Sequence, residues 1–434
     1  MEEKTIVVIY PETTVNGVRR FCEDLYSDKE LLCGYEINFC GLWFNERLKT
    51  NEKDICANTT QEKEKLEEYF KEHLDSINPD IIHLNTYAID VRILRYLLEK
   101  YGDRIVYTVH SVQPYHHTLP YNWFNEDLAK YLAKIANIER EGEDIAEEIE
   151  KEYNLTLSND EREALAIYSY LVSLQKEILK KAKEIIYNSP HTKEIAKEYY
   201  GIERGTVIRN GTGIFKKYDE NRIKYETNAL SWREKFFDRD DIIILYLGRI
   251  TKNKGILDLL EAFKRVPYLP NLKLIIAGIF EEDIKEIVEK EEEYGKRIFI
   301  IEGKDLTDEK IISLYVAADV VVYPSERESA GLVPLEAASL GKLTIVREVD
   351  NLLNYVNENL VYGFKSKEEL AKIIEEIAKK ILHIKKNPTS PTSLEFSKEI
   401  YERMRRVREE YSIERTREEY IRIFEKVIED RRGK

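Results

Sequence analysis

Two series of short, continuous apolar runs constrain the fold of this 434-residue chain more than any other feature. Runs of this kind, separated by amphipathic stretches, are typical of parallel strands that helices cover on both faces. The first series predicts strands at Thr5–Tyr10, Ile37–Trp43, Ile81–Leu84, Ile105–Val109 and Ile185–Asn188. The second predicts strands at Ile242–Leu247, Leu272–Ala277, Ile298–Ile301, Val320–Tyr323 and Leu343–Val346. Two such series predict two doubly wound α/β domains, whose ligands bind beyond the carboxyl ends of the strands.

The boundary between the two predicted domains falls in Arg209–Gly213, where the letters RNGTG suit a turn or hinge. The charged and aromatic stretch Ile214–Asp241 then reads as a connector into the second sheet. Near the end of the chain, Pro388–Ser393 reads as a loop rich in Pro, Ser and Thr. Two strongly helical stretches follow it, at Leu394–Tyr411 and Ile413–Ile428.

The bulk composition excludes some classes of function. The formal net charge of −14 argues against a nucleic-acid surface, which needs an excess of Lys and Arg. No apolar run approaches the roughly 20 residues of a membrane-spanning helix. The N-terminal letters MEEKTIVVIY carry two acids where a signal peptide has its basic region. We therefore expect a cytoplasmic protein without a nucleic-acid partner.

The cysteines are predicted to be free thiols. They are Cys22, Cys33, Cys40 and Cys56, and no two of them form the CxxC pair that is usual in zinc sites. The 35% of charged residues and the scarcity of glutamine are typical of a hyperthermophile, where a disulfide stays an alternative. The only glutamines are Gln61, Gln113 and Gln175.

The strongest motif is SERESAGLVPLEAASLGK, in which seven residues separate Glu328 from Glu336. A buried strand runs into this segment. A helix is predicted to begin within Ala330–Leu332, because Pro334 is tolerated only in a first turn. The free backbone amides at such a helix start suit an anion or sugar hydroxyls. Glu336 then lies one turn inside the helix, and Glu328 lies in the loop before it.

The second motif is LGRITKNKGILDLLEAF. The predicted strand ends at Leu247, and Gly248 and Arg249 form the turn. Lys254 and Gly255 precede an amphipathic helix. Two cations at the carboxyl end of a strand suit a diphosphate, which Arg249 can bind with two nitrogens and Lys254 as a point charge.

With these two motifs in this order, the chain resembles family 4 retaining glycosyltransferases of the GT-B fold. Further matching segments are Gly17–Arg19 after the first strand, Thr108–His110, Asn188–Thr192 and Asn210–Gly213. The resemblance implies two Rossmann-like domains that face a cleft. It implies an acceptor domain at 1–210, with a helical insertion at about 111–183, and a nucleotide-sugar donor domain at 211–411. A C-terminal helix at 412–434 would pack back on the first domain.

The resemblance also implies an activity. Such an enzyme transfers a hexose from a UDP- or GDP-sugar to a saccharide or lipid-linked acceptor and retains the anomeric configuration. It needs no cofactor and no metal, because the two cations and the helix amides stabilise the leaving group. The partners are then the donor and the acceptor. Stable membrane attachment is not favoured, and the oligomeric state is not encoded in these motifs.

Residue roles follow from the same resemblance. Arg249 and Lys254 hold the diphosphate, Glu336 binds the ribose, and Glu328 contacts the donor sugar. His110 reaches that sugar from the first domain. The backbone of the donor site is contributed by Asn16, Gly17, Gly248, Ser329, Ala330, Gly331 and Leu332.

Three departures from the family pattern concern the donor sugar. Asn16 stands where a second glycine is usual, Ser329-Ala330 replaces an aromatic-glycine step, and Arg209 replaces a proline. With these departures, a non-catalytic homologue stays an alternative, such as a nucleotide-sugar-binding scaffold or partner subunit. A nucleotide-sugar epimerase of the same fold is a further alternative.

For several of these residues, a purely structural role is the alternative to a role in ligand binding. Glu328 and Glu336 suit a helix N-terminus as solvated carboxylates, and Arg249 and Lys254 suit a charged surface loop. His110 suits a hydrogen-bonded core histidine.

The structural alternative for Gly17 is that it only begins a helix and contacts no ligand. The segment Ser111–Lys183 is too long for a plain crossover. It is either an acceptor-binding element, whose aromatic residues stack on sugars, or a structural helical insertion. These aromatic residues are Tyr115, Tyr121, Trp123 and Phe124.

Overall fold

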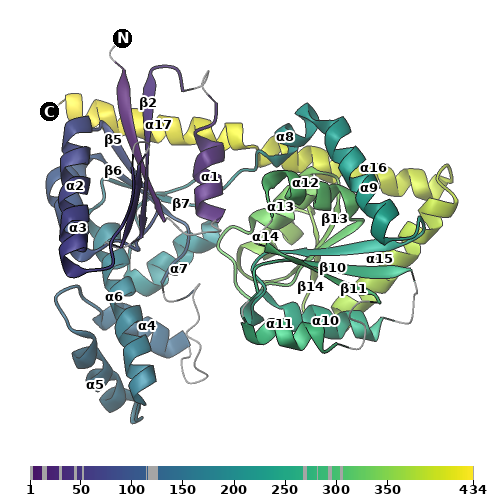
Figure 1. Ribbon diagram of the computed structural model, residues 1–434, viewed down its shortest axis with the longest axis horizontal. Coiled ribbons are helices and arrows are strands. Elements are labelled where there is room, and N and C mark those ends of the chain that lie inside the picture. Colours follow the sequence, from purple (N-terminus) through teal and green to yellow (C-terminus); the bar gives the residue numbers. More distant parts are fainter. Residues whose placement is uncertain are drawn as a thin grey trace. The chain divides into compact units, whose positions relative to one another are not determined.

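The computed structural model describes residues 3–11, 17–28, 32–43, 46–50, 53–113, 115, 126–266, 271–280, 282–291, 296–303 and 306–433. Its contacts divide the chain into two compact units (Figure 1). Unit 1 comprises Met1–Asn210 together with Ile413–Lys434, and unit 2 comprises Gly211–Ser412. Each unit is an α/β domain with its own sheet.

The sheet of unit 1 has the strand order β4-β3-β2-β1-β5-β6-β7-β8. Its strands are β1 (Lys4–Pro11), β2 (Tyr35–Trp43), β3 (Arg47–Thr50), β4 (Asp54–Cys56), β5 (Ile81–Leu84), β6 (Ile105–Val109), β7 (Glu184–Tyr187) and β8 (Thr206–Val207). All neighbouring strands are parallel except β3 and β4, which extend one edge as an antiparallel ribbon. Every residue of β5 and β6 is buried, as expected where helices cover both faces.

Helices cover both faces of this sheet. They are α1 (Gly17–Leu25), α2 (Thr60–Ile77), α3 (Val91–Tyr101), α4 (Glu126–Ile135), α5 (Gly142–Tyr153), α6 (Asn159–Lys181), α7 (Pro190–Tyr200) and α17 (Ile413–Arg432). Alternate residues of β1 enter opposite cores, because successive side chains of a strand point to opposite faces. Val7 and Ile9 join the core with α2 and α3, whereas Ile6 and Val8 join the core with α1 and α17.

Helix α17 is fastened to α1 by a buried arginine. The Arg417 side chain is 2% exposed. Its Nε donates to the carbonyl of Leu25 at 2.6 Å, and its Nη2 donates to the carbonyl of Asp24 at 2.8 Å. Its Nη1 lies 3.3 Å from the carboxylate of Asp28. One guanidinium therefore satisfies carbonyls at the end of α1 that the helix itself leaves without donors.

The sheet of unit 2 is all-parallel, with the strand order β11-β10-β9-β12-β13-β14. Its strands are β9 (Ile242–Leu247), β10 (Leu272–Gly278), β11 (Ile298–Glu302), β12 (Val320–Tyr323), β13 (Leu343–Arg347) and β14 (Tyr362–Phe364). The order reverses between β9 and β12, and a sheet of this kind binds ligands beyond the carboxyl ends at such a point.

The helices of unit 2 pack on both faces of its sheet. They are α8 (Ile214–Glu220), α9 (Arg222–Phe236), α10 (Ile256–Arg265), α11 (Glu282–Glu289), α12 (Asp308–Ala317), α13 (Leu332–Ser339), α14 (Asp350–Asn357), α15 (Lys367–Lys386) and α16 (Pro391–Glu410). The predicted connector at 214–241 thus contains two helices, α8 and α9. The predicted loop at 388–393 is shorter than expected, because Ser390 caps α16 and Pro391 occupies its first turn.

The ten predicted buried strands are all present, whereas four short strands were not predicted. These four are β3, β4, β8 and β14, with the sequences RLKT, DIC, TV and YGF. Each is too short or too polar to form a continuous apolar run. Each pairs at or beside a sheet edge, where exposure on one side removes the apolar pattern.

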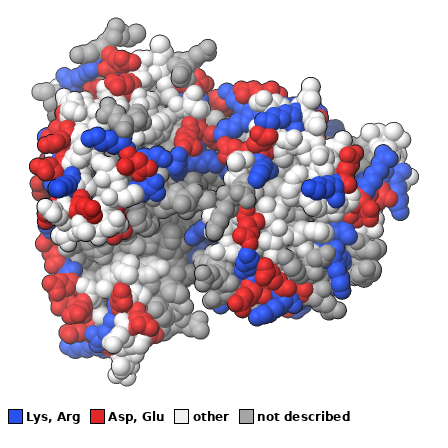
Figure 2. All heavy atoms as spheres, in the orientation of Figure 1, with Lys and Arg blue, Asp and Glu red and all other residues white. Residues whose placement is uncertain are grey.

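The surface is consistent with the mixed charge of the sequence. On the face that Figure 2 shows, acidic and basic side chains are interspersed over both units.

Within the described parts of the chain, no helix combines the length and apolarity needed to cross a membrane. All four cysteines carry free thiols; Cys22 and Cys40 are buried, and Cys33 and Cys56 are exposed.

Candidate functional site

The turn after β9 presents an exposed arginine, Arg249. Gly248 adopts a φ of 149°, which favours glycine. The Tyr246 hydroxyl donates to the carbonyl of Arg249 at 2.6 Å, and the amide of Ile250 donates to the carbonyl of Ile279 at 2.8 Å. These bonds fix the turn. The guanidinium of Arg249 is exposed, and no hydrogen bond or ion pair engages it among the described residues.

A glycine brings the second cation against the end of β12. Gly255 has a φ of 71°, and a Cβ atom built there would lie 2.1 Å from the carbonyl oxygen of Pro324. No side chain fits at this position. The amide of Glu326 also donates to the carbonyl of Asn253 at 3.0 Å. The KNKG turn and the SERES loop, 70 residues apart in the sequence, are therefore held together by backbone contacts.

Lys254 and Glu328 form an ion pair in this corner of unit 2. Their side chains are 15% and 11% exposed. The Tyr323 hydroxyl donates to the same Glu328 oxygen, Oε1, at 2.5 Å. Burial raises the pKa of Glu328, but the charge of Lys254 and the hydrogen bonds from Lys254 and Tyr323 outweigh it. The pKa of Glu328 is therefore lowered, and the carboxylate is ionised at neutral pH.

The loop that carries Glu328 is held by the first residues of α14, the helix that follows β13. The amide of Glu328 donates to Asp350 Oδ2 at 2.7 Å. Asp350 begins α14 with a φ of 48°, a left-handed conformation that is unusual for a residue other than glycine. The carboxamide of Asn351 donates to the carbonyl of Ala330 at 3.0 Å. The start of α14 thus positions both ends of the segment 328–330.

Helix α13 begins at Leu332, within the predicted range. Gly331 precedes it with a φ of 69°, and Pro334 lies in its first turn. The amides of Ala330, Gly331 and Leu332 donate no hydrogen bond within the described residues. Free donors at the positive end of a helix dipole attract an anion. Together with Arg249 and Lys254, they form a cationic corner at the carboxyl ends of β9 and β12.

The second glutamate of the motif lies inside the protein. Glu336 is 4% exposed, and the Tyr315 hydroxyl on α12 donates to its Oε2 at 2.8 Å. Both glutamates of the motif are therefore largely shielded from solvent and held by tyrosines. The alternative of two solvated carboxylates at a helix N-terminus does not describe this geometry.

In unit 1, His110 follows the last residue of β6. Its Nε2 donates to Asn85 Oδ1 at 2.9 Å, and the Asn85 amide donates to the carbonyl of His83 at 3.2 Å. The second bond orients the Asn85 oxygen toward His110. Burial lowers the pKa of His110 to about 3, so the ring is neutral at physiological pH. Its Nδ1 is then an acceptor, and no hydrogen bond engages it within the described residues.

His83 is the hydrogen-bonded core histidine of this region. It is fully buried, the Tyr26 hydroxyl lies 2.6 Å from its Nδ1, and Thr108 lies 2.8 Å from its Nε2. Both ring nitrogens of His83 are thus engaged, whereas one nitrogen of His110 is not. The half-buried His110 therefore differs from a core histidine in a way that suits ligand contact.

The remaining predicted segments of unit 1 lie near the same strand ends. Gly17 is the first residue of α1, and Asn16 lies outside the described residues. In NSPHT, Ser189 caps α7, and the Asn188 amide donates to the carbonyl of His110 at 3.1 Å. The described residues contain no group of three His, Cys, Asp or Glu side chains placed to hold a metal ion.

Several supporting residues were not predicted. Asn85 directly follows β5, and Asp350 lies just beyond β13, so their places after buried strands are a usable signal. Tyr315 carries no such signal, because only the packing of α12 brings it to α13. The unpredicted residues of the site are Asn85, Tyr246, Tyr315, Tyr323, Asp350 and Asn351.

Comparison of sequences finds a family model that matches part of the chain. Residues 230–403 match the model of the family described as glycosyl transferases group 1. An uncharacterized glycosyltransferase of Methanocaldococcus jannaschii is 28% identical over 219 residues, 47% of this chain and 50% of that protein. The lipopolysaccharide 1,2-N-acetylglucosaminetransferase of Salmonella typhimurium is 25% identical over 189 residues, 41% of this chain and 47% of that protein. The chain thus spans about half the length of these curated relatives.

Comparison of structures covers nearly the whole chain. The sucrose-phosphate synthase of Thermosynechococcus elongatus superimposes with a TM-score of 0.66 at 17% identity, over 98% of this chain and 100% of that protein. The Anabaena protein HepE, solved with UDP-glucose, superimposes with a TM-score of 0.61 at 14% identity, over 97% of this chain and 99% of that protein. At this identity the likeness shows the fold. The chain therefore has the GT-B fold, and its segment 230–403 matches the glycosyl transferases group 1 family.

Proposed function

We propose that this protein is a retaining, metal-independent glycosyltransferase that moves a hexose from a UDP- or GDP-sugar to a saccharide or lipid-linked acceptor. The observation that carries the proposal is the corner where Arg249, Lys254 and the start of α13 surround Glu328. Two cations and free helix amides suit the diphosphate of a nucleotide sugar. A shielded carboxylate beside them suits the hydroxyls of the sugar that the diphosphate carries.

The relatives support this class of reaction and donor. The matched family and the similar proteins of known name are glycosyltransferases. HepE was solved with UDP and with UDP-glucose. These names differ in sugar and acceptor, so the proposal names the class of donor and not one sugar.

The proposed step breaks the bond between the anomeric carbon and the diphosphate oxygen. Arg249, Lys254 and the α13 amides stabilise the charge that builds up on that oxygen. The acceptor hydroxyl forms its new bond to the anomeric carbon on the face that the diphosphate leaves. Its proton passes to a phosphate oxygen, so no base of the protein is required and the configuration is retained.

Two further residues orient the donor in this proposal. Glu336 accepts hydrogen bonds from the ribose hydroxyls through the carboxylate that Tyr315 holds. Neutral His110 accepts a hydrogen bond from a hydroxyl of the donor sugar through Nδ1, because Asn85 occupies Nε2. This assignment gives His110 the role of an orienting acceptor and not that of a proton donor.

The melting temperature of the full chain, measured against a panel of nucleotides and nucleotide sugars, tests the donor site. A ligand at one hundred times its Kd stabilises the folded state by about 2.7 kcal/mol. We expect one nucleotide family to raise the melting temperature equally with and without EDTA. A shift that EDTA abolishes would contradict metal independence, and no shift with any nucleotide would contradict the donor site.

Product analysis then distinguishes the kinds of activity. Acceptor-dependent release of nucleotide, with an unchanged anomeric configuration in the NMR spectrum of the product, is the expected outcome. Conversion of the donor without any acceptor would instead identify an epimerase. Donor binding without turnover over a broad acceptor panel would identify a binding scaffold.

Tyr315→Phe is expected to weaken donor binding more than catalysis. The change removes one hydroxyl, whose hydrogen bond to the buried Glu336 carboxylate is worth about 1.5–3 kcal/mol. We expect the KM for the donor to rise by about tenfold or more, while kcat changes little, because the ribose is bound equally in ground and transition states. Steady-state kinetics with varied donor measure both constants.

Tyr401→Phe is the matched control, because Tyr401 is an exposed tyrosine on α16. It removes the same atom and is expected to leave both constants unchanged. If Tyr315→Phe lowered kcat and left KM unaltered, Tyr315 would not act by orienting a ribose ligand.

A further inference from the structure

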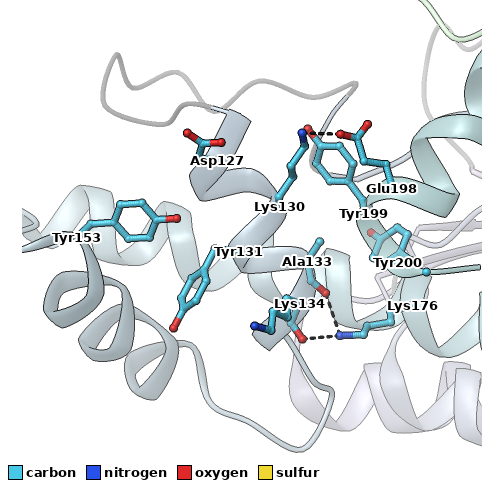
Figure 3. Close-up of a pocket in the computed structure, with 11 residues that line it drawn as sticks. Asp127, Lys130, Tyr131, Ala133, Lys134, Tyr153, Lys176, Glu198, Tyr199 and Tyr200 are labelled. Carbon is cyan, nitrogen blue, oxygen red and sulfur yellow. Dashed lines mark hydrogen bonds and ion pairs between the residues drawn. The ribbon is translucent and has the colours of Figure 1, made fainter.

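A pocket of about 570 Å³ lies between α7 and the helices α4, α5 and α6, which unit 1 inserts between β6 and β7 (Figure 3). One wall is α4, and the others are the end of α5, one residue of α6 and the end of α7. The volume is within the range of about 300–1,000 Å³ that is usual for small-molecule sites. In Figure 1, α4 and α5 stand beyond one end of the sheet of unit 1.

The apolar part of the pocket is aromatic. Tyr131 and Tyr153 meet edge to face with ring centroids 5.7 Å apart. The Tyr131 hydroxyl donates to Glu148 at 3.0 Å, whereas the Tyr153 hydroxyl has no hydrogen-bond partner among the described residues. On the opposite side, the ammonium of Lys130 lies 5.9 Å from the ring centre of Tyr199. The rings thus offer flat faces that are bordered by polar atoms.

Charges of both signs face the same space. Lys130 is paired with Glu198 at 2.5 Å, a contact that Figure 3 shows as a dashed line. Lys176 donates to the carbonyls of Ala133, Lys134 and Ala136 at 2.8–3.1 Å, so its ammonium is saturated. Asp127 and the Lys134 ammonium form no ion pair within the described residues.

Asp127 and Lys134, which form no ion pair with any residue that the structure describes, suit the two ends of one ligand. Asp127 and Lys134 are seven residues apart on α4, so they lie on one face, about 10 Å apart along the helix axis. Each can bind hydroxyl groups: the carboxylate accepts hydrogen bonds and the ammonium donates them. The tyrosine faces lie in the same pocket.

This lining discriminates between classes of ligand. The described lining contains no aliphatic side chain larger than Ala133, so it offers little to an acyl chain. The carboxylates of Asp127 and Glu198 would repel a polyanion. A neutral, hydroxyl-rich ligand fits both facts, because its CH faces pack on the rings and its hydroxyls reach both carboxylates and ammonium groups.

The pocket is also tied to the segment that follows His110. The hydroxyl of Tyr200, in the pocket wall, donates to the carbonyl of Gln113 at 2.6 Å. The amide of Gln113 donates to Gln175 Oε1 at 2.7 Å, and Gln175 Nε2 donates to the carbonyl of Ser111 at 2.7 Å. Two of the three glutamines of the chain are thus buried together and hold this segment against α6 and α7. The pocket wall and the strand end that carries His110 are parts of one hydrogen-bonded network.

We propose that this pocket binds a short neutral oligosaccharide, which is the acceptor of the transfer reaction. The saccharide site is argued from the lining of the pocket alone. The identification of the bound saccharide as the acceptor rests on the proposed function. The segment between β6 and β7 is then a ligand-binding element as well as a structural insertion.

The test uses the full chain and a panel of neutral gluco-, galacto- and manno-oligosaccharides of two to four sugar units. Binding is measured by calorimetry for the wild type, for the double variant Asp127→Ala/Lys134→Ala and for Tyr153→Ala. The double variant Glu147→Ala/Lys151→Ala is the matched control, because it removes one exposed acid and one exposed lysine from α5 outside the pocket. We expect at least one oligosaccharide to bind the wild type and the control equally, and each pocket variant at least tenfold more weakly.

A second readout separates this proposal from the donor site. The melting-temperature shift that the nucleotide produces is expected to be the same in the pocket variants and the wild type, whereas the KM for the bound oligosaccharide as acceptor rises at least tenfold. Absence of binding to the whole panel, binding unchanged in both pocket variants, or binding of anionic glycans only would overturn the saccharide site. A saccharide that binds without serving as acceptor would overturn the acceptor assignment. Failure of the nucleotide to shift the wild type would instead count against the donor site alone.

Discussion

Lys254→Ala is expected to lower kcat/KM by at least about 10²–10³-fold, the usual effect of removing one group that stabilises transition-state charge. Lys254 lies at the carboxyl end of β9, beside the free amides of α13, where the diphosphate is proposed to bind. The change also leaves the shielded carboxylate of Glu328 with the Tyr323 hydroxyl but without its cation. The pKa of Glu328 is then expected to rise. Initial rates over a range of donor concentrations measure the loss.

The control for this variant is Lys252→Ala. Lys252 belongs to the same short turn and is exposed, and it forms no ion pair among the described residues. Its removal takes away the same charge two residues from Lys254 and is expected to change the rate less than twofold. Comparable losses in both variants would mean that general positive charge, and not the position of Lys254, matters.

A double-mutant cycle distinguishes two roles of Lys254. If Lys254 served only to neutralise Glu328, the double variant Lys254→Ala/Glu328→Gln would be as active as Glu328→Gln alone. We expect the double variant to be much less active than Glu328→Gln, because the phosphate contact is lost in either background. Equal activity would contradict the assignment of Lys254 to the diphosphate.

Arg417→Ala is expected to have the largest effect on stability, about 3 kcal/mol. The side chain is 2% exposed and donates to two carbonyls at the end of α1, beside Asp28. Alanine leaves the Leu25 carbonyl without this donor, at a cost of about 1–3 kcal/mol for an unsatisfied buried group. The Asp24 carbonyl keeps hydrogen bonds from the amide and hydroxyl of Ser27, but the contact with Asp28 is lost as well. Urea unfolding followed by circular dichroism measures the change.

Arg415→Ala is the matched control on the same helix. The Arg415 side chain is 59% exposed, and it forms an ion pair with Glu419 at 3.7 Å. An exposed pair of this kind contributes about 0–1 kcal/mol. Similar losses in both variants would show that Arg417 contributes helix propensity or net charge and not its buried hydrogen bonds.

The strands show which parts of the fold the apolar pattern of the sequence can predict. The core strands were predictable because burial on both faces demands an unbroken apolar run, as in the IIHL of β5 and the VVVY of β12. The ribbon of β3 and β4 was not, because RLKT and DIC bury at most one face. The start of α13 was predictable from Pro334, since a proline ring is compatible only with the first turn.

The candidate site likewise has features that the sequence predicts and features that it does not. The order of residues along the chain was enough to predict which charged residues follow which buried strands, because local backbone rules place Arg249, Lys254 and Glu328 at strand ends. Packing of distant segments pairs Lys254 with Glu328, brings Tyr315 to Glu336 and places Arg417 at the end of α1, and none of these contacts was predicted. The physical reason is that hydrogen bonds and ion pairs between distant segments depend on packing distances of a few ångströms. No local pattern of residue types encodes those distances.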